Sequence, residues 1–309
     1  MSIAIVTSSD EAKEWKIALT DRLPNVSIEI VSSIEQPSKA PFLICWKPTK
    51  GQLNNFPNLR VIQSLGAGVD HIFEKNTIPE GVQIVRIIDE RLSEDMWEYL
   101  LAATMQHLKD FRQYEVQKRT TTWQRHAYRR VPDTTVSILG LGKIGGYVAE
   151  KFSRVGFQVQ GWSNSPKNLK GVRSFTGDTD LPFLLKNTDI LINLLPLTPA
   201  TQGILNRPLF QQLPSTSYLI NAGRGGHLVD EDLLAVLELG YLSGATLDVF
   251  HHEPLPSNHP FWQHPKILVT PHVASLTDVN SAINQVVDNY QRMIRGTDLL
   301  NKITVDKGY

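Results

Sequence analysis

The chain has 309 residues, which on the usual size of domains favours about two domains, each with a core of its own. Lys and Arg together number 31, as do Asp and Glu, so the formal net charge is zero. That balance does not favour nucleic acid or an anionic membrane as a partner. The single cysteine, Cys45, excludes an intrachain disulfide. Its apolar neighbours at positions 42–46 predict a buried core residue.

The start of the chain is typical of a short strand, because an apolar run follows Met1 directly without a basic segment. The longest apolar stretch, at positions 190–197, is too short to cross a bilayer. We therefore expect a cytoplasmic location.

Short β-rich runs alternate with helical ones in the first third of the chain, which is typical of a parallel sheet with helices on its faces. We expect strands at 3–7, 27–31, 42–46, 60–64 and 83–87, and a helix at 11–23. A long helix without internal Pro or Gly is expected at 96–114, where a hinge between two domains would lie. We interpret the basic residues that follow it as a solvated connection: Lys118, Arg119, Arg125, Arg129 and Arg130.

A second series of strands and helices begins at Thr134. We expect strands at 135–139, 158–162, 189–195, 218–222, 245–250 and 267–270, and helices at 144–155, 231–239 and 282–294. Asp230 is expected to cap the helix at 231–239 by accepting the amides of its first turn. The sequence therefore predicts an α/β protein with two parallel sheets.

A glycine-rich segment follows the strand expected at 135–139. Gly140, Gly142 and Gly145 have the G-x-G-x-x-G spacing. The first glycine permits a tight turn, the second lets the backbone approach a pyrophosphate, and the third allows close helix–strand packing. The amides at the helix start, at Lys143 and Ile144, would then meet the phosphates. We predict a dinucleotide site here; the alternative is a glycine-rich turn that binds nothing.

The end of the next strand carries no acidic residue. NAD-binding domains usually place an Asp or Glu there on the ribose 2′-hydroxyl, whereas this chain has Ser163, Asn164, Ser165 and Lys167. Hydroxyl and amide groups can donate to a 2′-phosphate, and the lysine adds positive charge. We therefore predict a preference for NADP(H), with NAD(H) also accepted. The alternative is a polar loop that is indifferent to the 2′ position.

Arg224, Glu253 and His272 each follow a predicted strand, and ligands of open parallel sheets bind beyond the carboxyl ends of the strands. Hydride addition to a 2-oxo acid develops negative charge on the carbonyl oxygen, which must then gain a proton. His272 is the natural proton donor, and Glu253 would orient it and favour its charged form. Arg224 would bind the carboxylate and polarise the carbonyl. Taken singly, each residue has a structural alternative: a loop contact, a solvated acid or a core histidine.

The remaining histidines of this region are interpreted as surface or loop residues: His251, His252, His259 and His264. We expect no metal site, because adjacent histidines rarely face one ion and no cysteine or acidic cluster accompanies them.

Together these segments resemble the D-isomer-specific 2-hydroxyacid dehydrogenase family, in its glyoxylate/hydroxypyruvate reductase A group. The resemblance covers nearly the whole chain and rests on positions 64–70, 140–145, 192–196, 221–225, 247–255 and 270–275, with 305–309 similar too. It implies two doubly wound domains. A Rossmann NAD(P)-binding domain would cover 99–277, and a discontinuous, flavodoxin-like substrate domain would combine 1–98 with 278–309.

The resemblance also implies further site residues. Backbone amides of the loop Leu65, Gly66, Ala67 and Gly68 would bind the substrate carboxylate, since glycines let the backbone close on an anion. Trp46 would either wall the substrate pocket or be a core aromatic. Additional cofactor contacts are expected at Leu195, Pro196, Ala222, Gly223 and Asp248. A homodimer through the cofactor domain is implied as well.

Two positions depart from the family pattern. Related reductases carry an arginine where this chain has Asn164, which bears on the strength of the NADP(H) preference. The motif after Arg224 continues with Gly225, Gly226 and His227, and the sequence suggests no role for His227.

The sequence thus predicts a reductase of small 2-oxo acids, converting glyoxylate to glycolate and hydroxypyruvate to D-glycerate. One alternative is a dehydrogenase for larger 2-oxo acids, or one that oxidises D-hydroxyacids with NADP. Another is a dinucleotide-sensing, corepressor-like protein with the same fold, against which the lack of a charge-rich partner segment counts.

Overall fold

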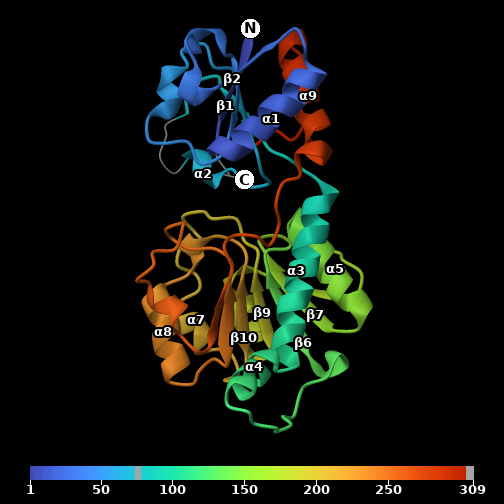
Figure 1. Cartoon of the computed structure of the whole chain (residues 1–309). Helices are drawn as coiled ribbons and strands as arrows, with labels where there is room; N and C mark the ends of the chain where they lie inside the picture. The colour runs from blue at the N-terminus through green and yellow to red at the C-terminus, as the bar shows by residue number, and fades with distance from the viewer. Residues whose placement is uncertain (74–77, 304–309) are drawn as a thin grey trace. The chain divides into compact units, whose positions relative to one another are not determined.

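The computed structural model describes residues 1–73 and 78–303, so the family-like segment at 305–309 lies outside the described residues. The chain forms two compact units (Figure 1). Unit 1 combines Met1–Leu92 with Leu276–Tyr309, and unit 2 is Ser93–Ser275. The chain passes from unit 1 to unit 2 within helix α3 (Glu90–Leu108). The two boundaries, after residues 92 and 275, lie a few residues before those expected from the sequence, after residues 98 and 277.

Unit 1 is built on a five-stranded parallel sheet in the order β2-β1-β3-β4-β5. This is the doubly wound order of flavodoxin-like domains. Its elements are β1 (Ser2–Val6), α1 (Ser9–Arg22), β2 (Ser27–Ile30), β3 (Phe42–Cys45), β4 (Val61–Ser64), α2 (Asp70–Phe73), β5 (Gln83–Val85) and α9 (Val279–Arg295), with 3-10 turns at Val31–Ser33, Pro37–Lys39 and Gln52–Asn55.

Alternate side chains of the central strands enter two cores, one on each face of this sheet. On β1, Ile3 and Ile5 pack in the core that α1 and α9 cover, whereas Ala4 and Val6 face the opposite core. Figure 1 shows α1 and α9 side by side on one face of the unit. The last helix of the chain therefore completes the core of the first domain. Cys45 is fully buried as expected, and burial raises the pKa of its thiol to about 12.

Unit 2 is built on a seven-stranded parallel sheet in the order β12-β11-β10-β9-β6-β7-β8. Its elements are α4 (Phe111–Arg119), β6 (Thr135–Leu139), α5 (Lys143–Val155), β7 (Gln158–Ser163), β8 (Val172–Thr176), α6 (Gly177–Lys186), β9 (Ile190–Asn193), α7 (Arg207–Phe210), β10 (Tyr218–Asn221), α8 (Asp230–Glu238), β11 (Gly244–Leu247) and β12 (Ile267–Val269), with 3-10 turns at Val131–Asp133, Gly225–His227 and Pro260–Trp262.

Helices cover both faces of this second sheet. Residues of α3 and α5 pack with alternate side chains of β6 and β9 in one core, and residues of α6, α7 and α8 fill the other. The strand order reverses between β6 and β9, because the chain first proceeds outward through β7 and β8 and then returns. In doubly wound sheets ligands bind at this reversal, outside the carboxyl ends of the strands. The predicted fold, two doubly wound α/β domains, is confirmed.

The long helix expected at 96–114 is wrong in its bounds, because the structure contains two helices there. Helix α3 already begins at Glu90 and ends at Leu108, and α4 begins at Phe111. Between them Asp110 adopts a left-handed conformation, with φ 59°. Asp tolerates this conformation better than most residues, so the break needs neither Gly nor Pro. Strand β8 and helix α6 were not expected, because β8 has only two apolar residues and α6 begins with a polar turn and contains Pro182.

Asp230 does not cap α8 as expected. Val229 is the N-cap residue and Asp230 is the first helical residue. Its carboxylate instead lies 3.4 Å from Nε2 of His259 and 3.8 Å from Nε2 of His251. The aspartate thus tethers the loop after β11 to the start of α8.

Candidate functional site

The strands of unit 2 end in one row. Backbone pairing aligns Leu139 with Asn193, Asn193 with Asn221, Asn221 with Leu247, and Leu247 with Val269. The segments that follow these five residues therefore leave the sheet at the same edge. They are the segments that carry the predicted cofactor and catalytic residues.

His272 and Glu253 are brought together at this edge. Nδ1 of His272 lies 2.8 Å from Oε2 of Glu253, and both side chains are about three-quarters buried or more, with 26% and 18% of their side-chain surface exposed. The other carboxylate oxygen of Glu253 accepts a hydrogen bond from Phe250 N at 3.0 Å. The carboxylate is therefore held by its own loop and orients the imidazole, as a carboxylate beside a histidine does.

The turn that carries His272 is wrapped around the buried Asp248. The Asp248 carboxylate accepts hydrogen bonds from Thr270 Oγ1 at 2.6 Å, and from Val273 N and Ala274 N at 2.9 Å each. His272 has φ 55°, a conformation that is uncommon for residues other than glycine and that surrounding contacts must support. Burial raises the pKa of Asp248, and these hydrogen bonds oppose that rise. Asp248 thus holds the His272 turn, a role that the sequence did not reveal.

Arg224 is partly buried at the end of the segment that follows β10. One guanidinium nitrogen, Nη1, donates to the carbonyl of Gly223 at 2.8 Å. Next to it, a Cβ added to Gly225 would lie 1.9 Å from the carbonyl carbon of Phe250. Only glycine permits this approach, which packs the Arg224 segment directly against the loop that leads to Glu253. The structure thus brings the three predicted catalytic residues to neighbouring segments of one sheet edge.

The glycines of the cofactor motif lie as their spacing predicts. Gly140 has φ 103°, and a Cβ there would lie 2.7 Å from the Leu194 carbonyl; a Cβ on Gly145 would lie 1.8 Å from the Gly140 oxygen. Both glycines are buried, whereas Gly142 is exposed at the start of α5. The backbone of Gly142, Lys143 and Ile144 is therefore open to a ligand at the positive end of a helix dipole.

Other predicted cofactor residues occupy the same edge. Leu195 and Pro196 follow β9, and Ala222 and Gly223 follow β10. Ser163, the last residue of β7, is buried and donates from Oγ to the carbonyl of Ser165 at 2.9 Å. The side chains of Asn164, Ser165 and Lys167 are exposed. The described loop thus offers an amide, a hydroxyl and an ammonium group and no carboxylate.

The predicted substrate residues lie in unit 1, after β3 and β4. Trp46 is half-buried, and a Cβ on Gly66 would lie 2.7 Å from its ring. Its ring contacts that of His71, with centroids 4.2 Å apart and the ring planes tilted by 48°. Trp46 therefore packs against the 65–68 loop itself. The sequence did not point to Arg86, whose Nη1 lies 3.4 Å from the Ala67 carbonyl and whose pKa is lowered by burial.

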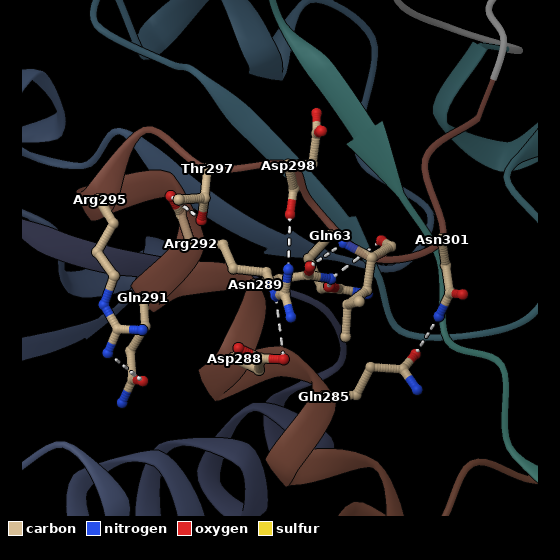
Figure 2. A network of polar contacts seen from close by, with 11 residues as sticks. Gln63, Gln285, Asp288, Asn289, Gln291, Arg292, Arg295, Thr297, Asp298 and Asn301 are labelled. Carbon is tan, nitrogen blue, oxygen red and sulfur yellow. Dashed lines mark hydrogen bonds and ion pairs between the residues drawn. The ribbon is translucent and has the colours of Figure 1, made fainter.

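A hydrogen-bond network at the end of β4 supports the 65–68 loop. Oγ of the buried Ser64 donates to the Gly68 carbonyl at 2.7 Å and accepts from Gly66 N at 3.3 Å. Beside it, Gln63 accepts at 3.0 Å from Asn289 of α9, which Figure 2 shows at the centre of the network. Asn289 also accepts from Leu300 N at 2.7 Å. Residues from the end of the chain therefore support the base of the predicted substrate loop.

Among residues 1–73 and 78–303, no group of His, Cys, Asp and Glu is arranged to hold a metal ion. No helix in that part of the chain is long and apolar enough to span a bilayer. His251 and His252 are exposed, and His259 and His264 lie partly buried in loops.

Comparison with known proteins agrees with the resemblance. The family model described as D-isomer specific 2-hydroxyacid dehydrogenase, NAD binding domain, matches residues 101–274. A glyoxylate/hydroxypyruvate reductase A from Yersinia enterocolitica is 41% identical over 305 residues, covering 97% of each chain.

Two solved structures are similar over almost their full length. A D-isomer specific 2-hydroxyacid dehydrogenase from Xanthobacter autotrophicus, in complex with NADPH and MES, has a TM-score of 0.92 at 34% identity and covers 100% of this chain and 99% of its own. An NADPH-dependent glyoxylate/hydroxypyruvate reductase from Sinorhizobium meliloti, in complex with NADP and sulfate, has a TM-score of 0.91 at 34% identity with 100% of both chains covered. The chain belongs to the D-isomer-specific 2-hydroxyacid dehydrogenase family.

Proposed function

We propose that the protein is an NADP(H)-preferring reductase of small 2-oxo acids, which converts glyoxylate to glycolate and hydroxypyruvate to D-glycerate. Membership of the family supports the oxidoreductase class, and the relative from Yersinia enterocolitica supports the substrates. The observation that carries the proposal is the Glu253–His272 pair, at 2.8 Å, held on the same sheet edge as Arg224 and the glycine-rich loop.

The residues present fit a dinucleotide. Among the described residues, an added Cβ at Gly142 would meet no heavy atom within 4 Å, so space is open beside this backbone. The amides of Lys143 and Ile144 would hold the pyrophosphate there, and the segments 195–196 and 222–223 would line the rest of the site. When bound, NADPH supplies the hydride. When the carbonyl carbon accepts the hydride, negative charge develops on the carbonyl oxygen. That oxygen must then gain one proton.

We assign that proton to His272. Its Nδ1 faces Glu253 Oε2, so the proton is delivered from Nε2, the other ring nitrogen. Glu253 stabilises the charged imidazolium that exists before the transfer and fixes its plane. The turn around Asp248 holds the ring in position. The 2-oxo acid thereby gains a hydride on carbon and a proton on oxygen, which gives the 2-hydroxy acid.

Arg224 binds the substrate carboxylate and polarises the carbonyl. A guanidinium presents several donors in a planar fork, which matches a carboxylate and stabilises charge on the neighbouring oxygen. For unit 1, we assign the amides of the Leu65–Gly68 loop to a substrate carboxylate, and Trp46, which packs against Gly66, would limit the size of the substrate.

Enzyme kinetics test this proposal most directly. NADPH and NADH oxidation would be followed with glyoxylate, hydroxypyruvate and larger 2-oxo acids. We expect His272→Ala and Arg224→Ala each to lower kcat/KM about 10²–10⁴-fold, as expected for loss of an acid catalyst or an oxyanion-stabilising group. His252→Ala and Arg130→Ala, at exposed positions, serve as matched controls. Undiminished turnover in either site variant would refute the role assigned to that residue.

The cofactor preference has its own test. We expect a higher kcat/KM with NADPH than with NADH. Asn164→Asp would place a carboxylate beside the 2′-phosphate and should shift the ratio toward NADH by about tenfold. A wild-type ratio that favours NADH would refute the NADP(H) preference.

We further propose that the protein is a cytoplasmic homodimer assembled through unit 2. Helix α4 and the segment after it expose large apolar side chains, with Phe111, Trp123 and Tyr128 at 58%, 96% and 60% exposure. Exposed apolar clusters of this kind mark protein interfaces. Light scattering should give twice the mass of one chain, and Trp123→Ser should weaken the assembly; a monomeric wild type would refute it.

A further inference from the structure

Three side chains meet beneath the segment that carries Arg224. Asn193 ends β9, Asn221 ends β10, and His227 lies in the short 3-10 turn at Gly225–His227. All three are completely buried. Burying an amide or an imidazole is costly unless its hydrogen bonds are made, so such a cluster is kept where its geometry matters.

The hydrogen bonds define the state of the His227 ring. The backbone N–H of Arg224 donates to Nδ1 of His227 at 3.1 Å. A backbone N–H can only donate, so in this contact Nδ1 accepts with its lone pair and the ring proton lies on Nε2; in the other tautomer Nδ1 would donate to the Arg224 carbonyl, which also lies 3.1 Å away. The amide of Asn193 can then also donate to Nδ1, from 3.0 Å. In this arrangement Nδ1 acts as an acceptor toward the Arg224 segment.

The same network also fixes the backbone carbonyl of Arg224. Asn221 donates from Nδ2 to the Arg224 carbonyl at 3.3 Å, and its Oδ1 accepts from Gly223 N at 3.3 Å. Asn193 Nδ2 donates to Asn221 Oδ1 at 2.9 Å, which joins the two halves. Both backbone groups of Arg224 are thus fixed by buried side chains.

The network also reaches the neighbouring segment after β9. Oδ1 of Asn193 accepts from Leu195 N at 3.3 Å, where a cofactor contact is predicted. Packing around it is tight, because a Cβ on Gly223 would lie 2.8 Å from Asn193 Nδ2 and 3.2 Å from His227 Nδ1. The direction of the Arg224 side chain is therefore linked to these buried contacts.

We propose that His227, together with Asn193 and Asn221, is the positioning network that aims Arg224 at the substrate carboxylate. The proposal rests on the function proposed above, in which Arg224 binds a 2-oxo acid. Because Nδ1 is the acceptor that matters, an asparagine at position 227 can replace it: its Oδ1 occupies nearly the same place in the side chain. A phenylalanine keeps the ring and removes the acceptor.

The first test compares His227→Phe with His227→Asn in NADPH-dependent glyoxylate reduction. We expect the phenylalanine variant to raise KM for glyoxylate by about tenfold or more, since the Arg224 N–H and the Asn193 amide lose their acceptor. KM for NADPH should change much less. The asparagine variant should recover most of the loss, which a purely space-filling role would not allow. Wild-type kinetics in His227→Phe, or equal losses in both folded variants, would overturn the inference.

A double-mutant cycle with Arg224→Lys separates positioning from general damage. If His227 acts through Arg224, then His227→Phe should cost far less in the Arg224→Lys background than in the wild type. Fully additive losses would contradict the inference. A wild type that reduces no 2-oxo acid would instead refute the proposed function, and the inference with it.

A measurement on the wild-type protein needs no variant to fold. Nitrogen NMR of the ¹⁵N-labelled His227 ring should show the neutral tautomer with its proton on Nε2 at neutral pH. A proton on Nδ1 would be incompatible with the Arg224 N–H donating to it, and would overturn the inference whatever the kinetics show.

Discussion

In each unit, buried polar side chains at a strand end support a loop that carries predicted site residues, but the partners of these side chains come from different parts of the chain. In unit 2, Asn193 contacts partners that lie 28 and 34 residues along the chain. In unit 1, Gln63 depends on Asn289, which is 226 residues away (Figure 2). The loop of unit 2 is thus organised by consecutive strands, whereas the loop of unit 1 requires the last helix to return.

This difference predicts where the consequences of mutation appear. Contacts between consecutive strands form as part of one local unit, while a contact between distant segments adds to the stability only after a large loop has closed. We therefore expect the unit 1 network to contribute chiefly to stability and the unit 2 network chiefly to catalysis.

The largest expected effect on stability is that of Asn289→Ala. The truncation leaves Gln63 Oε1 and Leu300 N without their partner and opens a cavity in a fully buried place. Each unsatisfied buried group costs about 1–3 kcal/mol, so the free energy of unfolding should fall by about 4 kcal/mol. Urea unfolding followed by circular dichroism would measure it.

Asn280→Ala, on the same helix but exposed, is the matched control, and its effect should stay within about 0.5 kcal/mol. Equal losses in the two variants would remove the distinction between the buried network and the helix surface. It would also weaken the contrast between the units.

The sequence predicted the fold and the candidate site only in part. The strand ends, the glycine-rich loop and the positions of Arg224, Glu253 and His272 could be predicted, because short apolar runs and glycine spacing are local signals. The confirmed family resemblance supplied the discontinuous first domain. No local pattern shows that Asn193, Asn221 and His227 meet, since their contact depends on the register of β9 and β10.

The sequence also did not show which partners certain polar side chains bind. Asp230 has the residue type and position of an N-cap, yet it binds His251 and His259, which lie in a loop after the next strand. Similarly, Asp248 was predicted as a cofactor contact, while its carboxylate is engaged by the His272 turn. For Asp230, a tertiary contact overrides the local preference for capping. For Asp248, the partners are known only once the turn has folded.

The next prediction concerns the pH dependence of stability. It rests on a buried titratable residue of unit 2, whereas the Gln63–Asn289 pair of unit 1 has no titratable side chain. In unit 2, His107 stacks on Tyr218 with ring centroids 3.9 Å apart. Burial lowers the pKa of His107 to about 4, with Arg129 contributing and Asp110 opposing. The unfolded chain therefore binds a proton between pH 6.5 and 4 that the folded chain does not. Stability from this group is present above pH 6.5 and lost as the pH falls toward 4.

His107→Phe keeps a ring in the stack and removes the titration. We expect the wild type to lose about 3 kcal/mol of unfolding free energy through this group between pH 6.5 and 4, and the variant to lose correspondingly less. Urea unfolding at a series of pH values gives both curves. His252→Phe, in an exposed loop, should keep the wild-type slope. Parallel wild-type and His107→Phe curves would show that this histidine is not the source.

The smallest effect tests whether the unit 1 network also has a catalytic consequence. Ser64→Ala removes the hydroxyl that bonds both Gly66 N and the Gly68 carbonyl. A hydrogen bond of this kind contributes about 1 kcal/mol, so loosening the loop should raise KM for glyoxylate about fivefold with little change in kcat. Ser2→Ala is the matched control, because Ser2 is also buried in unit 1 but its hydroxyl has no hydrogen-bond partner among the described residues. An unchanged KM in Ser64→Ala would confine the role of this network to stability and make the contrast between the units complete. A rise as large as that expected for His227→Phe would instead show that a distant partner can position a substrate loop as strictly as a local one.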